Sequence, residues 1–592
     1  SFQSEVPQMK KSLLTAFALL LIGSLSACGG SGGNIPTGPA VSVSPATANV
    51  QEGGTQQFTA TVTNTTSTTV NWQVNGVAGG NATVGTVSSS GLYTAPDVIP
   101  SPASVTISAV LQADTGISGN SIATITAVVF NNSSLKGNYV LSLTGIDLNG
   151  NAFTAVGAIA ADGNGNITSG EEDLNDVSSG YTLASSVTGT YSVTPDGRGT
   201  LNLVIPAISP TTFSYAFAIQ ALSNAVLNEI DNNVVNATGN LEAQTSGTPQ
   251  PSGNYAFGFA GSAVICGPGP LNSSGIFAMT SGSGGNIDGV QDANCAGSIT
   301  QNQSLSGTYG SIDGLGRGSG SLSLTSGRSS FVYYVVSASR YRFMSLATTV
   351  FFLGSADLQA QSSFAASNFN GSYVVSTSAN TVAGVSYTLI QLNASGGNIS
   401  SGYYDVNDTG NVANSSLTGA YSVTSNGRVS GSFTVSPLTL PFAMYMISPN
   451  QAYYLDERTT AVGGGTVYAQ SSAVTTNAAW AGSYATRQFG YFIVVGGILP
   501  GNSTSVSGQI SADGNGTLAG TLDINDPSGV FPGLTLQGSY SVGSVAPGRT
   551  TVAITTSEGT RNYIAYVVSP TQVLLLDVDS NLTAGGNAIR QF

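Results

Sequence analysis

The feature that most constrains this chain is a unit of about 110 residues that occurs four times in succession. Each copy opens with Gly-x-Tyr, and the openings stand at Gly137, Gly253, Gly371 and Gly482, which are 116, 118 and 111 residues apart. Solenoid and propeller repeats are shorter, so a period of this length indicates whole domains in tandem.

Within each copy an Asp-x-Asn pattern and a Gly-Arg pair also recur. For the arginines two explanations are open: a row of ligand contacts, or structural residues that each hold the turn between strands four and five. We favour the structural role, with Arg198 beside Asp162 and Arg549 beside Asp513. For Asp-x-Asn the alternatives are a cap at a strand end, which we favour, and a metal or sugar site. A glutamine ends each copy (Gln244, Gln361, Gln470 and Gln591). The recurring set is Asp173, Asn175, Arg198, Asp292, Asn294, Arg317, Asp405, Asn407, Arg428, Asp523, Asn525 and Arg549.

Copy one contains eight strand candidates, at residues 138–144, 152–160, 166–173, 186–194, 199–205, 212–220, 225–230 and 236–243. Turn chemistry such as Asp-Gly-Asn-Gly separates them, and no segment has capped helical periodicity. Eight sequential strands fit an antiparallel meander barrel, because closure removes exposed edges. A two-sheet sandwich is the alternative. The spacing faintly resembles lipocalin-like and avidin-like barrels, without a motif specific to either family.

Three segments are apolar on both faces: residues 331–336, 563–568 and 573–576. A free-standing barrel would alternate apolar and polar residues along these strands. We therefore expect neighbouring copies to cover the outer face of strands six and seven.

The N-terminal segment has a short basic region at Met9-Lys-Lys, an apolar run and then Leu-Ser-Ala-Cys28. This arrangement is typical of a secretory signal. The last four residues closely resemble the bacterial lipoprotein lipobox, which implies that Cys28 is lipidated. The resemblance implies an exported outer-membrane lipoprotein, on its periplasmic or cell-surface face, anchored to the membrane by lipid. Residues 1–8 precede the expected start at Met9, and a Gly-rich tether follows the cysteine.

Residues 41–130 form short alternating runs separated by Gly, Asn and Pro turns, which predicts a β-sandwich. Gly53-Gly-Thr-Gln-Gln-Phe-Thr-Ala, Val70-Asn-Trp and Gly91-Leu-Tyr-Thr-Ala-Pro resemble bacterial immunoglobulin-like domains of the group 2 type. The resemblance implies a core tryptophan at Trp72 and a role as a spacer or part of an adhesin.

The expected fold is therefore all-β: an N-terminal Ig-like sandwich followed by four barrel-like domains. The expected division is 1–28 upstream residues and signal peptide, 29–40 tether, 41–130 Ig-like domain, and repeats at 135–246, 251–362, 368–471 and 479–592.

Composition excludes several functions. Formal charge is −14 and no Lys/Arg cluster interrupts it, so nucleic acid is not an expected partner. Histidine is absent, which removes Ser-His-Asp catalysis and His-ligated zinc. Asp162-Gly-Asn-Gly-Asn166 fails the EF-hand pattern and is expected to be a hairpin turn. We expect no metal and no cofactor. Cys266 and Cys295 fall in loops at one end of the same barrel and are expected to form a disulfide, with free, buried thiols as the alternative.

These features favour a non-catalytic binding or adhesion module for glycans or envelope polymers, with avidity from four similar sites and exposed tyrosines suited to sugars. The first alternative is a structural surface-layer or matrix scaffold. The third hypothesis, after the binding module and the scaffold, is a polysaccharide-active enzyme using paired acids such as Glu171 and Asp173. The sequence leaves the oligomeric state open.

Overall fold

The computed structural model describes residues 38–147, 151–176, 180–209, 211–221, 224–231, 235–263, 266–267, 269–279, 284–324, 327–347, 350–472, 474–493 and 502–592. The expected signal peptide, Cys28 and most of the tether lie outside these residues.

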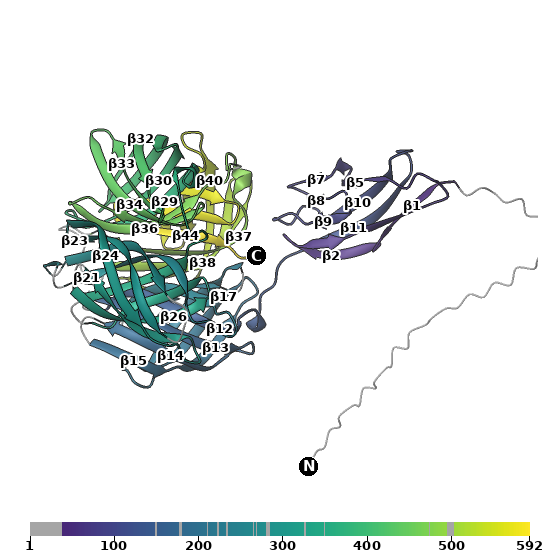
Figure 1. The fold of residues 1–592 in the computed structure, drawn as a ribbon. Helices are drawn as coiled ribbons and strands as arrows, with labels where there is room; N and C mark the ends of the chain where they lie inside the picture. Colours follow the sequence, from purple (N-terminus) through teal and green to yellow (C-terminus); the bar gives the residue numbers. More distant parts are fainter. Residues whose placement is uncertain are drawn as a thin grey trace, which may run out of the picture.

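The N-terminal unit consists of short strands that pack around one apolar core, which includes Phe58, Trp72 and Tyr93. In Figure 1 this unit stands beside the body formed by the rest of the chain. Its sheets are β2(Thr47–Gln51)-β11(Ser118–Thr126)-β10(Ser104–Leu111)-β5(Val70–Val74)-β6(Val77–Ala78), β3(Thr55–Gln57)-β9(Leu92–Thr94)-β8(Gly85–Val87)-β7(Gly80–Asn81), and the pair β1(Ala40–Ser44)-β4(Thr59–Thr63).

Each of the four copies forms a closed antiparallel barrel of eight strand positions, which confirms the all-β meander and excludes the sandwich alternative for the repeats. Barrel one is β12(Lys136–Asp147), β13(Ala152–Asp162), β14(Asn166–Asp176), β15(Gly180–Ser186) with β16(Thr188–Val193), β17(Arg198–Val204), β18(Thr212–Ile219), β19(Ala225–Glu229) and β20(Val235–Ala243). Barrel two is β21(Gly253–Ala263), β22(Gly269–Met279), β23(Gly285–Cys295), β24(Ser298–Tyr309), β25(Arg317–Leu324), β26(Gly327–Ser337), β27(Arg340–Ser345) and β28(Val350–Leu358).

Barrel three is β29(Gly371–Thr381), β30(Val385–Ser395), β31(Asn398–Asp408), β32(Asn411–Val423), β33(Arg428–Val435), β34(Leu438–Ser448), β35(Gln451–Asp456) and β36(Ala461–Ala469). Barrel four is β37(Ala481–Phe492), β38(Ser503–Asp513), β39(Thr517–Asp526), β40(Gly529–Val542), β41(Arg549–Thr556), β42(Gly559–Ser569), β43(Gln572–Asp577) and β44(Leu582–Arg590). Single 3-10 turns precede barrels one, three and four, at Asn132–Ser134, Ala366–Asn368 and Asn477–Ala479.

Each barrel encloses its own apolar core, because strand alternation turns every second side chain inward. The tyrosine of each Gly-x-Tyr opening is part of that core (Tyr139, Tyr255, Tyr373 and Tyr484). Most of the tyrosines expected on the surface are likewise buried. The expected sugar-binding tyrosine surface is therefore wrong.

Apolar clusters also join neighbouring barrels, which confirms the predicted covering of strands six and seven. Between barrels one and two, Val140 and Val156 pack against Val332 and Tyr334. Barrels two and three meet through Ala256 and Tyr445 among others, and barrels three and four through a cluster that contains Leu389 and Tyr566. The apolar cluster between barrels four and one is smaller and consists of Ala218, Val226 and Ala485, and hydrogen bonds such as that from Asn228 to Ser505 add to this interface. The four barrels thus meet in a closed cycle.

Candidate functional site

The recurring arginine of each barrel pairs with the recurring aspartate of the barrel before it. Arg317 donates to both carboxylate oxygens of Asp173, at 2.7 and 2.8 Å. Arg428 pairs with Asp292 and Arg549 with Asp405. Barrel one completes the cycle, because Arg198 Nη1 lies 3.2 Å from both oxygens of Asp523 in barrel four. Four pairs therefore join four barrels into a ring.

A buried tyrosine completes three of these four pairs. Tyr334, Tyr445 and Tyr566 donate to the same aspartates at 2.7, 2.9 and 2.7 Å. Each of these tyrosines stands directly opposite the arginine of its own barrel in the strand register. In barrel one the opposite residue is Ala218. The interface between barrels four and one therefore lacks this hydrogen bond.

The recurring asparagines cross the same interfaces. Because residues two apart on a strand face the same side, Asp-x-Asn directs both side chains out of the barrel. Asn407 donates to the carbonyls of Asp577 and Leu582 in barrel four, at 2.9 and 2.7 Å. The others follow the same pattern: Asn175 to Ser345, Asn294 to Asp456 and Ala461, and Asn525 to Glu229.

A glutamine at the end of each barrel binds the turn of the next. Gln470 Nε2 donates to the carbonyls of Pro547 and Val567, and the corresponding residues are Gln244, Gln359 and Gln591. In barrel two this residue is Gln359, so the assignment of Gln361 to the repeat is wrong. The glycine before each arginine has positive φ and no Cβ, which leaves room for the amide; at Gly548 a Cβ would lie 2.6 Å from Gln470 Nε2.

The expected contacts of Arg198 and Arg549 with Asp162 and Asp513 are wrong. Asp162 is occupied by its own turn, where it accepts from the backbone of Asn164 and the side chain of Asn166 at 2.7 and 2.8 Å. These bonds, that from the Asn166 side chain foremost, lower the pKa of Asp162 to about 2. The arginines instead extend outward to a buried carboxylate of the adjacent barrel, and Arg198 also pairs with Asp196 of its own turn. The loop at 162–166 is the expected hairpin turn.

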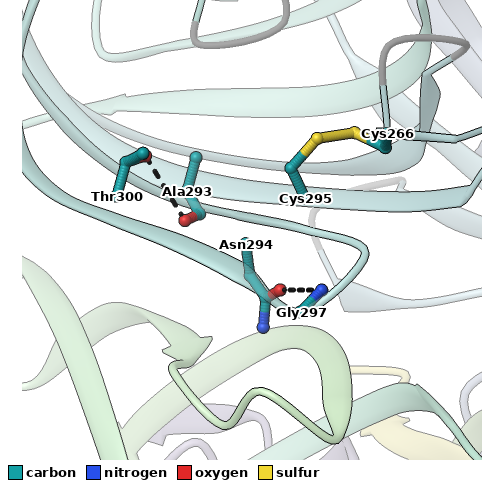
Figure 2. Close-up of a disulfide and its surroundings, with 6 residues drawn as sticks. All are labelled: Cys266, Ala293, Asn294, Cys295, Gly297 and Thr300. Carbon is teal, nitrogen blue, oxygen red and sulfur yellow. Dashed lines mark hydrogen bonds between the residues drawn. A yellow bond between two sulfur atoms is a disulfide. The ribbon is translucent and has the colours of Figure 1, made fainter.

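Cys266 and Cys295 form a disulfide in barrel two. It connects the segment after β21 to the end of β23 (Figure 2). Asn294, the neighbour of Cys295, points away from the disulfide toward barrel three (Figure 2). The disulfide therefore fixes the end of the strand that carries an interface residue.

Barrel four has a pocket of about 250 Å³ at one end of its interior. Its walls are largely apolar and include Leu522, Ile554 and Tyr563. Asp526, Glu558 and Arg561 are the charged residues of the lining, and the Arg561 guanidinium lies 4.9 Å from the Phe492 ring centre. The pocket thus combines apolar walls with charged groups of both signs.

The strand register explains why barrel four is hollow at this end. In barrel two, the stacked rings of Phe259 and Phe352, 4.5 Å apart, fill the interior. Counting from the Gly-x-Tyr tyrosines along paired strands, Gln488 and Ala584 occupy these positions in barrel four. Both residues line the pocket. Replacing two stacked rings with an amide and a methyl group leaves the space.

Polar groups beside this pocket lack partners. Among the described residues, Gln488 Nε2 and Asp577 Oδ2 are buried without a hydrogen bond. Asp577 stands opposite Tyr563 in the strand pairing, and burial raises the pKa of Asp577 to about 8. The Asp577 carboxyl is therefore largely protonated at neutral pH. Gln488, which lines the pocket, and Asp577, which stands beside the lining residue Tyr563, are neutral groups that can donate or accept hydrogen bonds.

The described residues contain no group of three or more acidic or cysteine side chains arranged to hold a metal ion. They also contain no helix with the length and hydropathy needed to cross a membrane. Of the two acids considered for catalysis, Glu171 and Asp173, Asp173 is bound to Arg317 and Tyr334 in the interface between barrels one and two. Asp173 therefore has a structural role.

Comparison with known proteins gives no family. No family model matches the chain, and no curated protein matches it. Among solved structures it is similar to the vaccine antigen transferrin binding protein B from Haemophilus parasuis, in a crystal structure of a tryptophan-to-alanine mutant. That match has 10% sequence identity and a TM-score of 0.16, and it covers 66% of this chain and 83% of the other. A TM-score this low supports no conclusion about fold or function.

Proposed function

We propose that this chain is a non-catalytic binding protein of the cell envelope, with its ligand site in barrel four. The observation that carries the proposal is the pocket of about 250 Å³, at a position that paired phenylalanines fill in barrel two. Ligand pockets are typically concave and mostly apolar with a few polar groups, and this one is small for the class. It fits a single ring or a short chain with a neutral polar end, such as the terminal unit of a glycan or envelope polymer.

In the same proposal Cys28 anchors the chain to the membrane and the immunoglobulin-like unit at 41–130 is a spacer. Asp97 of that unit pairs with Arg590 of barrel four at 2.6 Å, so the unit contacts the ring of barrels. The tether would then present a ring of barrels away from the membrane. Replacing Cys28 with serine should release the protein from membranes, whereas retention would contradict the anchor.

The expected avidity from four similar sites does not form part of the proposal, because the recurring residues are engaged between barrels. That same engagement favours the second candidate, a structural scaffold of the envelope. Four sets of interface residues joining one chain into a ring are what a rigid component needs. The scaffold would need no ligand.

Filling the pocket tests the binding proposal. We would titrate the full chain by calorimetry with monosaccharides, peptidoglycan fragments and short-chain amphiphiles. Ala584→Phe restores the ring found in barrel two and should abolish binding while preserving the thermal unfolding midpoint. Ser511→Ala, on the same barrel outside the pocket lining, is the control. Absence of binding across the panel, or equal binding by Ala584→Phe, would favour the scaffold.

A further inference from the structure

A second cavity, separate from the pocket in barrel four, lies where the four barrels meet. It has a volume of about 380 Å³, and residues of all four barrels line it. The lining is rich in hydroxyl and amide groups, among them Ser142, Asn240 and Asn272. A neighbouring cavity of about 370 Å³ shares Thr144, Ala260 and Asn272 with it. The centre of the ring is therefore hollow, and hydroxyl and amide groups form part of its wall.

Arg487 contributes a positive charge to this cavity. It stands three residues after the Gly-x-Tyr tyrosine of barrel four, where the other copies have Ser142, Gly258 and Ser376. Within the described residues, Arg487 has no ion pair and no hydrogen bond to another side chain. Burial, and to a lesser extent the charge of Arg342, lower the pKa of Arg487 to about 10. It nevertheless stays charged at neutral pH.

The charges around Arg487 do not balance. Arg342 also lines the cavity, but Glu242 accepts from it at 2.5 Å. Arg340 lies 3.3 Å from Glu242 and 2.6 Å from Asp357. Three arginines thus face two carboxylates, which leaves one net positive charge. Unpaired buried charge is costly, so a bound counterion would stabilise this region.

Unpartnered polar atoms flank Arg487 on both neighbouring strands. Ser507 and Asn587 stand directly opposite Arg487 in the pairing register. Among the described residues, Ser507 Oγ and Asn587 Oδ1 are buried and have no hydrogen-bond partner. Side chains opposite one another on adjacent strands lie within about 5.5 Å at Cβ. A guanidinium, a hydroxyl and an amide oxygen therefore share one face without side-chain partners.

We propose that the centre of the ring binds a small oxyanion, held by Arg487, which lines the cavity, and by the Ser507 hydroxyl opposite it on the neighbouring strand. A guanidinium binds the planar carboxylate, or two oxygens of sulfate or phosphate, through paired N–H donors. The Ser507 hydroxyl adds a donor, and the Asn587 amide can donate only through its Nδ2, because its Oδ1 is an acceptor. The chain's overall charge of −14 repels anions, but at physiological salt that repulsion is screened beyond about 8 Å. The local charge therefore decides occupancy.

Inorganic phosphate, acetate and glucuronate are the probes, each titrated into the full chain at constant ionic strength. Calorimetry and the thermal unfolding midpoint should both show saturable binding to the native protein. Phosphate binding alone would indicate an inorganic ion, and binding of acetate or glucuronate would indicate an organic acid or acidic sugar. Absence of saturable binding by all three would overturn the proposal.

Arg487→Gln removes the charge and should lose at least tenfold in affinity, while its anion-free unfolding midpoint equals or exceeds that of the native chain. Lys136→Gln, which removes an exposed cation that lines neither cavity, is the matched control and should bind the probes unchanged. Equal binding by Arg487→Gln would refute the site. If that variant does not fold, native crystals soaked in selenate settle the question: anomalous signal at Arg487 supports the site, and its absence refutes it.

Discussion

The pair between Asp173 and Arg317 allows a quantitative test of the ring. The Asp173 side chain has 0% exposure and accepts hydrogen bonds from Arg317, Tyr334 and the backbone of Ala184. Arg317→Ala leaves this carboxylate buried without a cation. Removing one partner of a buried ion pair costs about 3–5 kcal/mol, so we expect barrels one and two to separate more easily by that amount.

The double variant Asp173→Ala/Arg317→Ala removes both charges and should cost less than the sum of the single variants, with a coupling of about 2–3 kcal/mol. Arg198→Ala is the internal comparison. Arg198 reaches Asp523 through one nitrogen at 3.2 Å, also pairs with Asp196, and has no tyrosine in support. We expect its loss to cost about 1–2 kcal/mol.

Hydrogen exchange of peptides from β14 and β26 is the appropriate assay. The two tryptophans, Trp72 and Trp480, lie in the N-terminal unit and barrel four, so fluorescence would not report on this interface. We expect peptides of β14 and β26 to exchange faster in Arg317→Ala than in Arg198→Ala. The faster exchange should at first be confined to the interface between barrels one and two. Additive single-variant effects, or a loss below about 1 kcal/mol for Arg317→Ala, would show that the pair does not hold the barrels together.

Three further outcomes are expected. Burial raises the pKa of Glu172 and Asp577 to about 8, so the folded chain binds more protons than the unfolded chain between pH 4 and 8. The urea midpoint of unfolding should therefore fall as the pH rises from 5 to 8.5. A rise in the midpoint would contradict the raised pKa values. Replacing Cys266 and Cys295 with serine should destabilise barrel two by about 3 kcal/mol, measured by exchange of its strands. Gln591→Ala should increase exchange in the turn before β17, while exchange elsewhere in barrel one stays constant.

The architecture of the repeats could be predicted because it depends on local features. Gly-x-Tyr spacing, turn residues and strand alternation placed seven of the eight strands of copy one within a few residues of their observed positions. Strand four was predicted at 186–194, but it begins at Gly180 and is divided into β15 and β16. A register shift at Asp173 interrupts its pairing with β14, and alternation does not reveal such an irregularity.

The role of the recurring residues could not be predicted because it depends on contacts between domains. A sequence shows that Asp173 and Arg317 recur, but not that one copy's arginine reaches the previous copy's aspartate. A signal was available in Gln591: the fourth copy keeps the glutamine found at the end of the earlier copies. The barrel-four pocket also had a signal, because aligning the copies on Gly-x-Tyr places Gln488 where copy two has Phe259.

The closed set of pairs fixes how many copies the chain can have. Each interface is heterologous, and such contacts close only when the rotations between successive copies complete one turn. In a descendant that lost one barrel, or gained a fifth, the ring would not close. The interface aspartate at one end and the interface arginine at the other would then be exposed to solvent or to another molecule. Unequal recombination between the copies would therefore produce chains that associate into larger assemblies, and the copy number should be preserved as strictly as any single residue.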